Sequence, residues 1–338
     1  RSSDLIRLNL DGTIDTGFTI GNGFTNLVNS LDIQSDGKIL VGGTFTSYSG
    51  SSQNRLIRLN SNGVKDTSFD VGSGFDNNIN IIKIQSDGKI LVGGAFTTYS
   101  GETKYNYSTT KYISSILNNS NINTGFTCHD SFNNTIWCVE KQSDGKILVG
   151  GDFTTYSGVT TNRIIRLNSD GTRDTGFTIG TGFNNQILSI KTQSDGKILI
   201  GGAFSQYNSV TQNRIIRLNE NGSIDTGFTI GGGLSSSLYS IFIQTDNKIL
   251  LIGRFTSYSG ITQNYITRLN SNGTIDTSFN IGTGLNTFGN YIGQLSSGKI
   301  LIGGYFTYYY YSTDINNFLK INLDGTIEIG RASCRERV

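Results

Sequence analysis

The stretch SDGKILVGGTFTSYSG at Ser35–Gly50 decides the fold, because it returns almost unchanged along the chain. It stands again as SDGKILVGGAFTTYSG at Ser86–Gly101. The intervals between copies are 51 residues, except for one of 57. A fixed period of this length indicates a repeat architecture. The aromatic residue of the GGxF phrase is expected at equivalent buried places: Phe45, Phe96, Phe153, Phe204, Phe255 and Phe306.

A second phrase recurs with the same period as the first, as in RLNLDGTIDTGF from Arg7 and RLNSNGVKDTSF from Arg58. The Asp-Gly and Asn-Gly pairs in both phrases supply the positive φ angles that tight hairpin turns need. The short segments between these turns are interpreted as strands, and nothing between them has helical spacing. Four short strands are expected in each unit: 187–193 and 197–204, with 163–168 and 174–179 taken from the preceding unit.

The two other connections in each unit are longer, as at Thr46–Asn54 and Gly21–Asn26. In a meander of antiparallel strands, tight and long connections alternate between opposite faces, so both long loops are expected on one rim. Four strands in a unit of this size are typical of a β-propeller blade. We therefore predict an all-β fold, a β-propeller of four-stranded blades.

The paired phrases DGKILVGG…F and NRxxRLNxDGxxDTGF resemble the delta-60 repeat, a propeller repeat of bacterial surface, secreted and phage proteins. More loosely, they resemble the kelch blade. The resemblance covers about Arg1–Ile327. It implies a propeller fold but no activity, because that family has no common catalytic residues to transfer.

The register of the repeat predicts one propeller domain over 1–327. Seven-fold curvature is favoured, and a six-bladed ring whose sixth blade is closed by the N-terminal half unit is the alternative. Residues 328–338 break the pattern and are expected to be sequencing-adapter read-through rather than native sequence. The predicted parts are a half unit at 1–25 and units at 26–76, 77–133, 134–184, 185–235, 236–286 and 287–327.

The composition of the chain argues against several classes of function. The net charge is only +2 and the basic residues are scattered, so we expect no nucleic-acid partner. No apolar run reaches the roughly 18 residues of a membrane span, so no membrane insertion is expected. A single His and the absence of known catalytic motifs predict no enzyme activity, no cofactor and no metal site. Arg58 and Asp66, with their counterparts, are expected to pair across a hairpin.

In a near-symmetric repeat, function is expected where one unit departs from the others. The six-residue insertion lies within Tyr99–Tyr112, and the next long loop carries Cys128, His129 and Asp130 where other copies have Ile-Gly-x. Drift in one degenerate unit is the default explanation of these changes, and packing is the default role for the recurring loop tyrosine. Against drift, the insertion adds Tyr105 and Tyr107 to a rim that already bears tyrosine. Our predicted contact patch is Tyr99, Tyr105, Tyr107, His129 and Asp130.

These features favour a non-catalytic binding or display module of a secreted, cell-surface or phage protein. Its expected location is extracellular, at the cell surface or on a virion. We expect it to contact a glycan or a protein through the rim of long loops, where aromatic, amide and hydroxyl groups gather. The alternatives are a polysaccharide-acting propeller enzyme with carboxylates at the channel mouth, and a structural spacer without a ligand.

Overall fold

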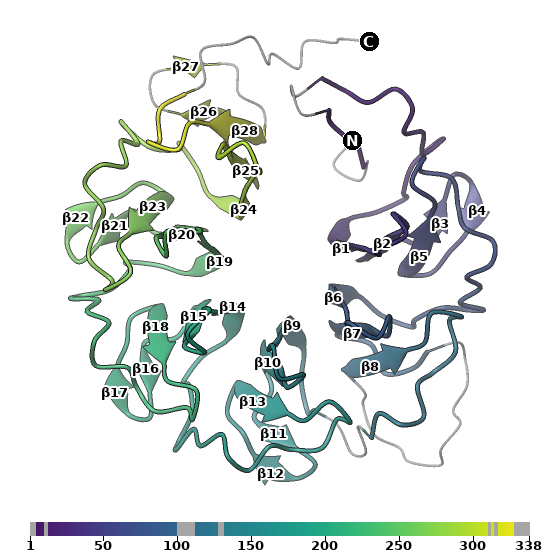
Figure 1. Ribbon diagram of the computed structural model, residues 1–338, viewed down its shortest axis with the longest axis horizontal. Helices are drawn as coiled ribbons and strands as arrows, with labels where there is room; N and C mark the ends of the chain where they lie inside the picture. The colour runs from purple at the N-terminus through teal and green to yellow at the C-terminus, as the bar shows by residue number, and fades with distance from the viewer. Residues whose placement is uncertain are drawn as a thin grey trace. The chain divides into compact units, whose positions relative to one another are not determined.

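The computed structural model describes residues 5–9, 13–99, 112–127, 132–309, 312–313 and 317–327. The chain divides into two compact units, Arg1–Asp174 and Thr175–Val338. All regular elements in the described ranges are β-strands (Figure 1). These ranges contain no helix long and apolar enough to cross a membrane. That residues 1–327 act as one domain stays a prediction.

Each blade is built on an antiparallel sheet whose strand order follows the chain. The first sheet consists of β1 (Val28–Ile33), β2 (Ile39–Gly43) and β5 (Leu56–Leu59). In the first unit the sheet recurs as β6 (Ile79–Ile84), β7 (Ile90–Gly94) and β8 (Ile113–Ile116), and as β9 (Ile136–Lys141), β10 (Ile147–Gly151) and β13 (Ile164–Leu167). The predicted all-β repeat of blades is confirmed.

The second unit repeats the same sheet three times. Its strands are β14 (Ile187–Thr192), β15 (Ile198–Gly202) and β18 (Ile215–Leu218); β19 (Leu238–Ile243), β20 (Ile249–Gly253) and β23 (Ile266–Leu269); β24 (Gly289–Gln294), β25 (Ile300–Gly304) and β28 (Phe318–Ile321). First strands of neighbouring blades pack together, β1 on β6 and β6 on β9 in one unit, β14 on β19 and β19 on β24 in the other. The last sheet is completed by its own β28, and the number of blades stays a prediction.

The predicted fourth strand, 174–179 with its counterparts, is wrong. A single bridge stands just before this place, as between Leu59 and Lys65, and none lies within its described residues. The cause is the aspartate that follows, because the Asp66 carboxylate accepts the backbone N–H of Ser68 at 3.0 Å. The Phe69 N–H also donates to the Asp66 carbonyl at 3.2 Å. These two bonds turn the chain where an extended strand was expected.

The tight hairpins are confirmed, but the turn type differs from the one predicted. Gln34 N–H donates to the Lys38 carbonyl at 2.8 Å, and Gly37 N–H donates back to Gln34 at 2.9 Å. Only Gly37 of this turn has positive φ, at 82°, as in a type I turn closed by a glycine bulge. Asn247, with φ of 63°, fills the glycine position in the one copy that lacks glycine there.

Both long loops of a blade lie together, as predicted. Phe24 in the loop before β1 forms a bridge with Tyr48, and Ser49 N–H donates to the Gly23 carbonyl at 2.9 Å. The middle loop also folds into a small hairpin, which was not predicted. Its strands are β3 (Ser47–Tyr48) and β4 (Ser51–Ser52), with counterparts β11 (Thr155–Tyr156) and β12 (Val159–Thr160), β16 (Gln206–Tyr207) and β17 (Val210–Thr211), β21 (Ser257–Tyr258) and β22 (Ile261–Thr262), and β26 (Tyr308–Tyr309) and β27 (Ser312–Thr313).

An aromatic group forms the core under these loops. All six GGxF phenylalanines are buried, with at most 1% of each exposed, as the repeat predicts. In the first blade the ring centroid of Phe24 lies 4.7 Å from that of Phe45 and 4.8 Å from that of Tyr48. The Tyr48 hydroxyl donates to the carbonyl of Gly63 in the outer hairpin. The recurring tyrosine therefore packs within the blade.

The two glycines of the ILVGG strand have separate roles. A Cβ on Gly42 would lie 2.6 Å from Cγ2 of Ile79 in the next blade, so this glycine permits close packing of neighbouring sheets. One copy reverses the pattern, because Ile252 stands at the position of Gly42 and Gly289 at that of Ile79. A Cβ on Gly289 would overlap the side chain of Ile252. In this copy the large side chain belongs to the preceding blade and the glycine to the next one, so the same space between the sheets is filled from the other side.

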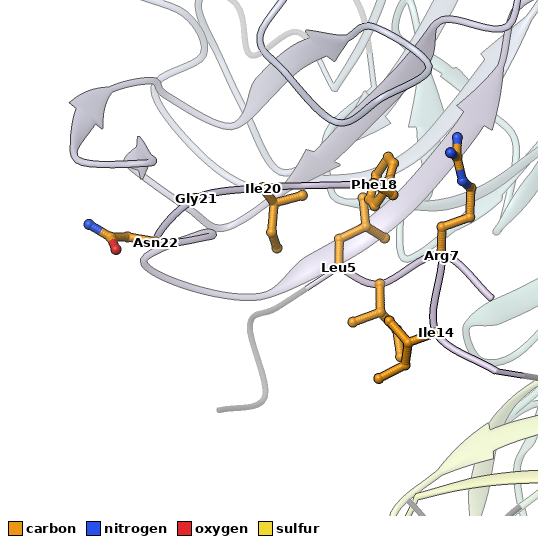
Figure 2. A pocket seen from close by; sticks show the side chains of 8 residues that line it. Leu5, Arg7, Ile14, Phe18, Ile20, Gly21 and Asn22 are labelled. Carbon is orange, nitrogen blue, oxygen red and sulfur yellow. The ribbon is translucent and has the colours of Figure 1, made fainter. Parts of the chain in front are cut away.

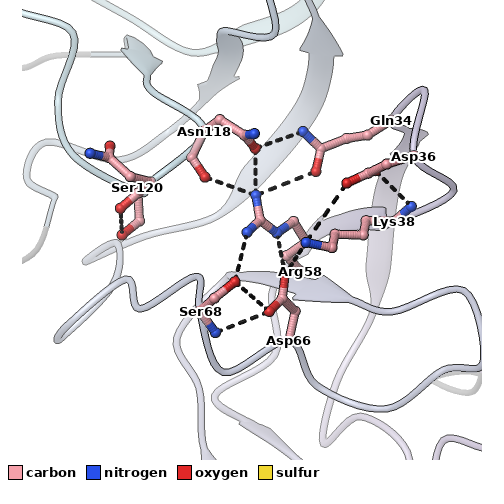
Figure 3. A network of polar contacts seen from close by, with 9 residues as sticks. Gln34, Asp36, Lys38, Arg58, Asp66, Ser68, Asn118 and Ser120 are labelled. Carbon is pink, nitrogen blue, oxygen red and sulfur yellow. Dashed lines mark hydrogen bonds and ion pairs between the residues drawn. The ribbon is translucent and has the colours of Figure 1, made fainter.

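The predicted arginine–aspartate pairs are confirmed. Arg58 Nε lies 2.8 Å from Asp66 Oδ2, and Lys38 Nζ lies 3.2 Å from the same oxygen (Figure 3). Burial alone would raise the pKa of Asp66, but hydrogen bonds from Ser68 and from these two cations hold that pKa well below 3.8. Arg58 Nη1 donates to the Asn118 carbonyl at 2.8 Å, which joins two blades.

The same ion pair recurs wherever the sequence keeps both residues. The Nε–Oδ2 distances are 2.7 Å for Arg166 with Asp174, 2.6 Å for Arg217 with Asp225 and 2.6 Å for Arg268 with Asp276. One blade exchanges both partners, because Asn123 Nδ2 donates to Ser115 Oγ at 3.2 Å. A neutral pair replaces the charged pair there.

Candidate functional site

A β-bulge interrupts the first strand of every blade. In β19 the pairing with β20 passes from Leu238 to Ser240, so Tyr239 is the extra residue. A bulge redirects its side chain and is a frequent device beside functional sites. The bulged residues are Asn29, Asn80, Trp137, Leu188, Tyr239 and Asn290.

Two further positions are fixed next to each bulge. The residue after the second strand donates its N–H to the residue before the first, as from Arg254 to the Ser237 carbonyl at 2.8 Å. Gly253 permits this approach, because a Cβ there would overlap the Ser237 carbonyl oxygen. The backbone frame is the same in each blade, yet the side chains on it differ. After the second strand they are Thr44, Ala95, Asp152, Ala203, Arg254 and Tyr305; before the first they are Leu27, Asn78, Thr135, Gln186, Ser237 and Phe288.

In the first unit two of the bulged side chains serve the fold. Asn29 Nδ2 donates to the Ile79 carbonyl and Asn80 Nδ2 to the Ile136 carbonyl, both at 2.9 Å, so each asparagine joins two blades. Trp137 differs, because 37% of it is exposed. Its Nε1 donates to Asp152 Oδ2 at 2.8 Å, which orients the indole on the surface.

In the second unit the same positions gather an aromatic–arginine cluster: Tyr239, Arg254, Phe288 and Tyr305. The guanidinium carbon of Arg254 lies 4.4 Å from the ring centroid of Phe288 and 5.9 Å from that of Tyr239. Phe288 stands edge-on to Tyr239 at 5.8 Å and tilted to Tyr305 at 5.1 Å. Tyr305 is 57% exposed, and Arg254 is also exposed. The cluster is a surface built of π faces and one cation.

Arg254 differs from the buried arginines of the RLN phrase in its exposure and in its lack of an acidic partner within the described ranges. Four arginines of the RLN phrase are buried against aspartates, namely Arg58, Arg166, Arg217 and Arg268. Arg254 forms no ion pair with any residue in the described ranges. Its planar guanidinium is always charged and carries five N–H donors. Such a group suits a carboxylate, which can accept two parallel hydrogen bonds. The adjoining rings suit the apolar face of a flat ligand.

The structure places only one residue of the predicted contact patch, Tyr99. It is 6% exposed, its ring centroid lies 4.5 Å from that of Phe75, and its hydroxyl donates to the Ser120 carbonyl at 2.7 Å. Burial, and after it the charge of Asp70, raises the pKa of Tyr99. Tyr99 is thus a packing residue, and its expected contact role finds no exposed surface. The other four lie outside the described residues: Tyr105, Tyr107, His129 and Asp130.

Sequence reasoning missed the aromatic–arginine cluster, although a signal for it existed. The x of the GGxF phrase reads Thr, Ala, Asp, Ala, Arg and Tyr along the chain while its neighbours stay constant. Such variation shows that the blade does not require one side chain at this place, which leaves the position available for recognition. In the described part of the chain, no three His, Cys, Asp or Glu residues form a group that could hold a metal ion.

Comparisons with known proteins agree with this fold. The family model described as "Domain of unknown function (DUF5122) beta-propeller" matches residues 1–18, 34–69, 85–106, 142–177, 193–228, 244–279 and 295–328. A search of curated proteins found no match.

Among solved structures, the chain is similar to the WD40 β-propeller domain of Doa1, with a TM-score of 0.55, 15% identity and coverage of 88% of this chain and 79% of that one. It is also similar to the extracellular domain of a putative hybrid two-component system from B. thetaiotaomicron, with a TM-score of 0.53 and 15% identity. That alignment covers 97% of this chain but only 37% of the other. At this identity the likeness shows the fold alone. Since the family model matches more than half of the residues, the chain belongs to the DUF5122 β-propeller family.

Proposed function

We propose that the chain is a non-catalytic binding module that takes a carboxylate-bearing glycan at the aromatic–arginine cluster. The observation that carries this proposal is that Arg254, which has no ion pair among the described residues, lies over Phe288 beside the exposed Tyr305. A sugar ring with a carboxylate offers a flat C–H face for the aromatic rings and two oxygens for the guanidinium.

A glycan fits better than an apolar protein surface because the cluster is small and carries the positive charge of Arg254, which no described residue neutralises. Buried apolar anchors dominate the energy of protein interfaces. Within the part of the chain that the structure describes, Arg254 of this cluster has no acidic partner, so a ligand without an acidic group would leave its charge without an ion pair.

Binding is favoured over catalysis by the composition of the cluster. Its four side chains contain no carboxylate and no imidazole, the groups that most often act as general acid or base. The resemblance to delta-60 repeats supports a secreted, cell-surface or phage protein. The location is also compatible with the fold likeness to the extracellular domain of a putative hybrid two-component system.

A polysaccharide panel tests the proposal. The purified chain is titrated with polymers of uronic acids, with the same polymers after reduction of the carboxyl groups, and with neutral glucans. We expect binding to the uronic polymers, and at least tenfold weaker binding to the reduced ones. Equal binding to both forms, or none to any polymer, contradicts the proposal. Release of new reducing ends during incubation would favour the enzyme alternative.

A further inference from the structure

A polar hollow of about 310 Å³ lies between two neighbouring blades of the second unit. Every described residue that lines it is polar or a glycine, among them Gln193, Lys197, Arg217, Gly227, Ser271 and Asn272. A hollow of about 270 Å³ elsewhere in the chain has a different lining, composed mainly of apolar side chains such as Leu5, Ile14 and Phe18 (Figure 2). A ligand of the polar hollow must therefore satisfy hydrogen-bonding groups rather than cover apolar surface.

The guanidinium of Arg217 supplies a buried charge to this hollow, because only 7% of its side chain is exposed. Its Nε lies 2.6 Å from Asp225 Oδ2. Its Nη1 donates to the Ser271 carbonyl and lies 3.3 Å from Gln193 Oε1. The other terminal nitrogen, Nη2, has no acceptor among the described residues. A buried donor without an acceptor is unfavourable, so the hollow lacks a group that this nitrogen needs.

The first blade fills the equivalent space with side chains of the protein itself (Figure 3). Asn118 Oδ1 accepts hydrogen bonds from Gln34 Nε2 at 2.9 Å and from Arg58 Nη1. Ser68 Oγ lies 3.3 Å from Arg58 Nη2. Two side-chain oxygens therefore lie against the two terminal nitrogens of that guanidinium.

The blade of Arg217 keeps the donors of this arrangement and lacks both acceptors. Gln193 and Arg217 are present, whereas Gly227 stands in the place of the serine and Ser271 in that of the asparagine. No other complete repeat combines the arginine with glycine and serine at these two places. The two smaller residues leave space where the first blade has its two oxygens.

We propose that the polar hollow binds a small hydroxylated carboxylate, whose two oxygens take the places of the missing serine and asparagine oxygens. A carboxylate fits the terminal nitrogens of a guanidinium because it accepts two parallel hydrogen bonds. Ser194, Asn247 and Asn272 add hydroxyl and amide groups to the lining, and these groups suit the hydroxyl groups of the ligand.

The charges around the hollow also admit a carboxylate. Asp225 is shared by two cations, because Lys197 Nζ lies 3.2 Å from the same oxygen that Arg217 contacts. Asp195 Oδ2 lies 3.9 Å from Lys197 Nζ, and its side chain is 55% exposed, so this pair is weak. The two buried or half-buried cations therefore have one close carboxylate between them, and a second carboxylate would balance their charge.

The polar hollow is distinct from the aromatic–arginine cluster. Asn247 lines the hollow just before β20 begins, whereas Arg254 follows the end of that strand. The two sites thus lie at opposite ends of one strand, and each can be altered without the other.

The test is an NMR titration of the full chain with sodium D-glycerate, with glycerol and sodium chloride as controls at matched concentration. We expect saturable shifts of the Gly227 and Asn272 amides with glycerate alone. Ser271→Asn supplies the amide of the first blade and should raise the Kd at least tenfold. Ser169→Asn makes the same change at the same register of the repeat that lacks the arginine, and it should leave the Kd unchanged.

Gly227→Ser is a second blocking variant, because it supplies the serine oxygen of the first blade, and it should also weaken binding. Both substituted residues are exposed, so melting should show both variants folded. No saturable shift with glycerate, equal shifts with glycerol, or an unchanged Kd in both blocking variants overturns the proposal. Shifts that vanish in Arg254→Ala overturn it in favour of the aromatic–arginine cluster. Polysaccharide binding by that cluster should survive Ser271→Asn, so either proposal can fail without the other.

Discussion

The guanidinium carbon of Arg254 lies 4.4 Å from the ring centroid of Phe288, so a cation of one blade rests on an aromatic ring of the next. Arg254 follows β20, and Phe288 stands directly before β24. The pair joins two neighbouring blades without an acidic partner in the described residues. Arg254 therefore differs from the repeated arginines such as Arg58, which form ion pairs with aspartates.

The first prediction concerns the aromatic core. Phe204→Ala should lower the free energy of unfolding by about 3–5 kcal/mol, because the ring is fully buried and would leave a cavity. Urea denaturation measures the change, with the exposed Val210→Ala as the matched control. A loss below about 1 kcal/mol would show that the core does not depend on this ring.

The second prediction tests whether the neutral pair of Ser115 and Asn123 can replace the ion pair of Arg58 and Asp66. Arg58→Ser should destabilise the first blade by about 3 kcal/mol, because it removes one partner of a buried ion pair. Adding Asp66→Asn reproduces the Ser115–Asn123 pair and should recover at least about 1 kcal/mol. A double-mutant cycle in urea gives the coupling. Additive losses would mean that the two side chains are not energetically linked.

The third prediction is a dependence on pH. Hydrogen bonds outweigh burial and lower the pKa of Asp66 and Asp276 from 3.8 in the folded chain. Because the folded pKa lies below the unfolded one, this stabilisation is complete above about pH 4 and is lost as the pH falls through the folded pKa. The melting temperature should therefore fall with acidification below about pH 4, and fall less steeply in the Arg58→Ser, Asp66→Asn variant. A melting temperature that rises on acidification contradicts this account.

The fourth prediction concerns the exchanged pair Ile252 and Gly289. Gly289→Ile alone should cost about 1–3 kcal/mol, because the new side chain meets Ile252. Adding Ile252→Gly restores the arrangement of Gly42 with Ile79 and should recover most of that loss. Thermal melting of both variants measures it. Equal stability of the single and double variants would show that the two residues do not compete for one space.

Most of the fold follows from the sequence, because repetition at a fixed period repeats each local signal. The buried phenylalanines, the hairpins and the Arg58–Asp66 pair were all predicted. The fourth strand was not predicted correctly, since Asp66 folds the chain through a local hydrogen bond that competes with extended pairing. Tyr99 suggested a contact surface because it lies in a loop, yet its ring completes the core.

The aromatic–arginine cluster could not be predicted by inspecting neighbouring residues. Tyr239, Arg254, Phe288 and Tyr305 lie far apart along the chain, and a bulge together with the backbone bonds beside it brings them together. A bulge inserts one residue and changes the face of every later side chain in simple alternation, so its position must be known first.

The central claim is that Arg254 is the anion-binding group of a glycan site. Isothermal titration with the tightest uronic oligosaccharide tests it most directly, on the unmodified chain, Arg254→Ala and the matched control Arg173→Ala, whose side chain is also exposed. The account predicts at least a tenfold rise in Kd for Arg254→Ala, a partial rise for Tyr305→Ala and no change for Arg173→Ala. An unchanged Kd for Arg254→Ala would contradict it.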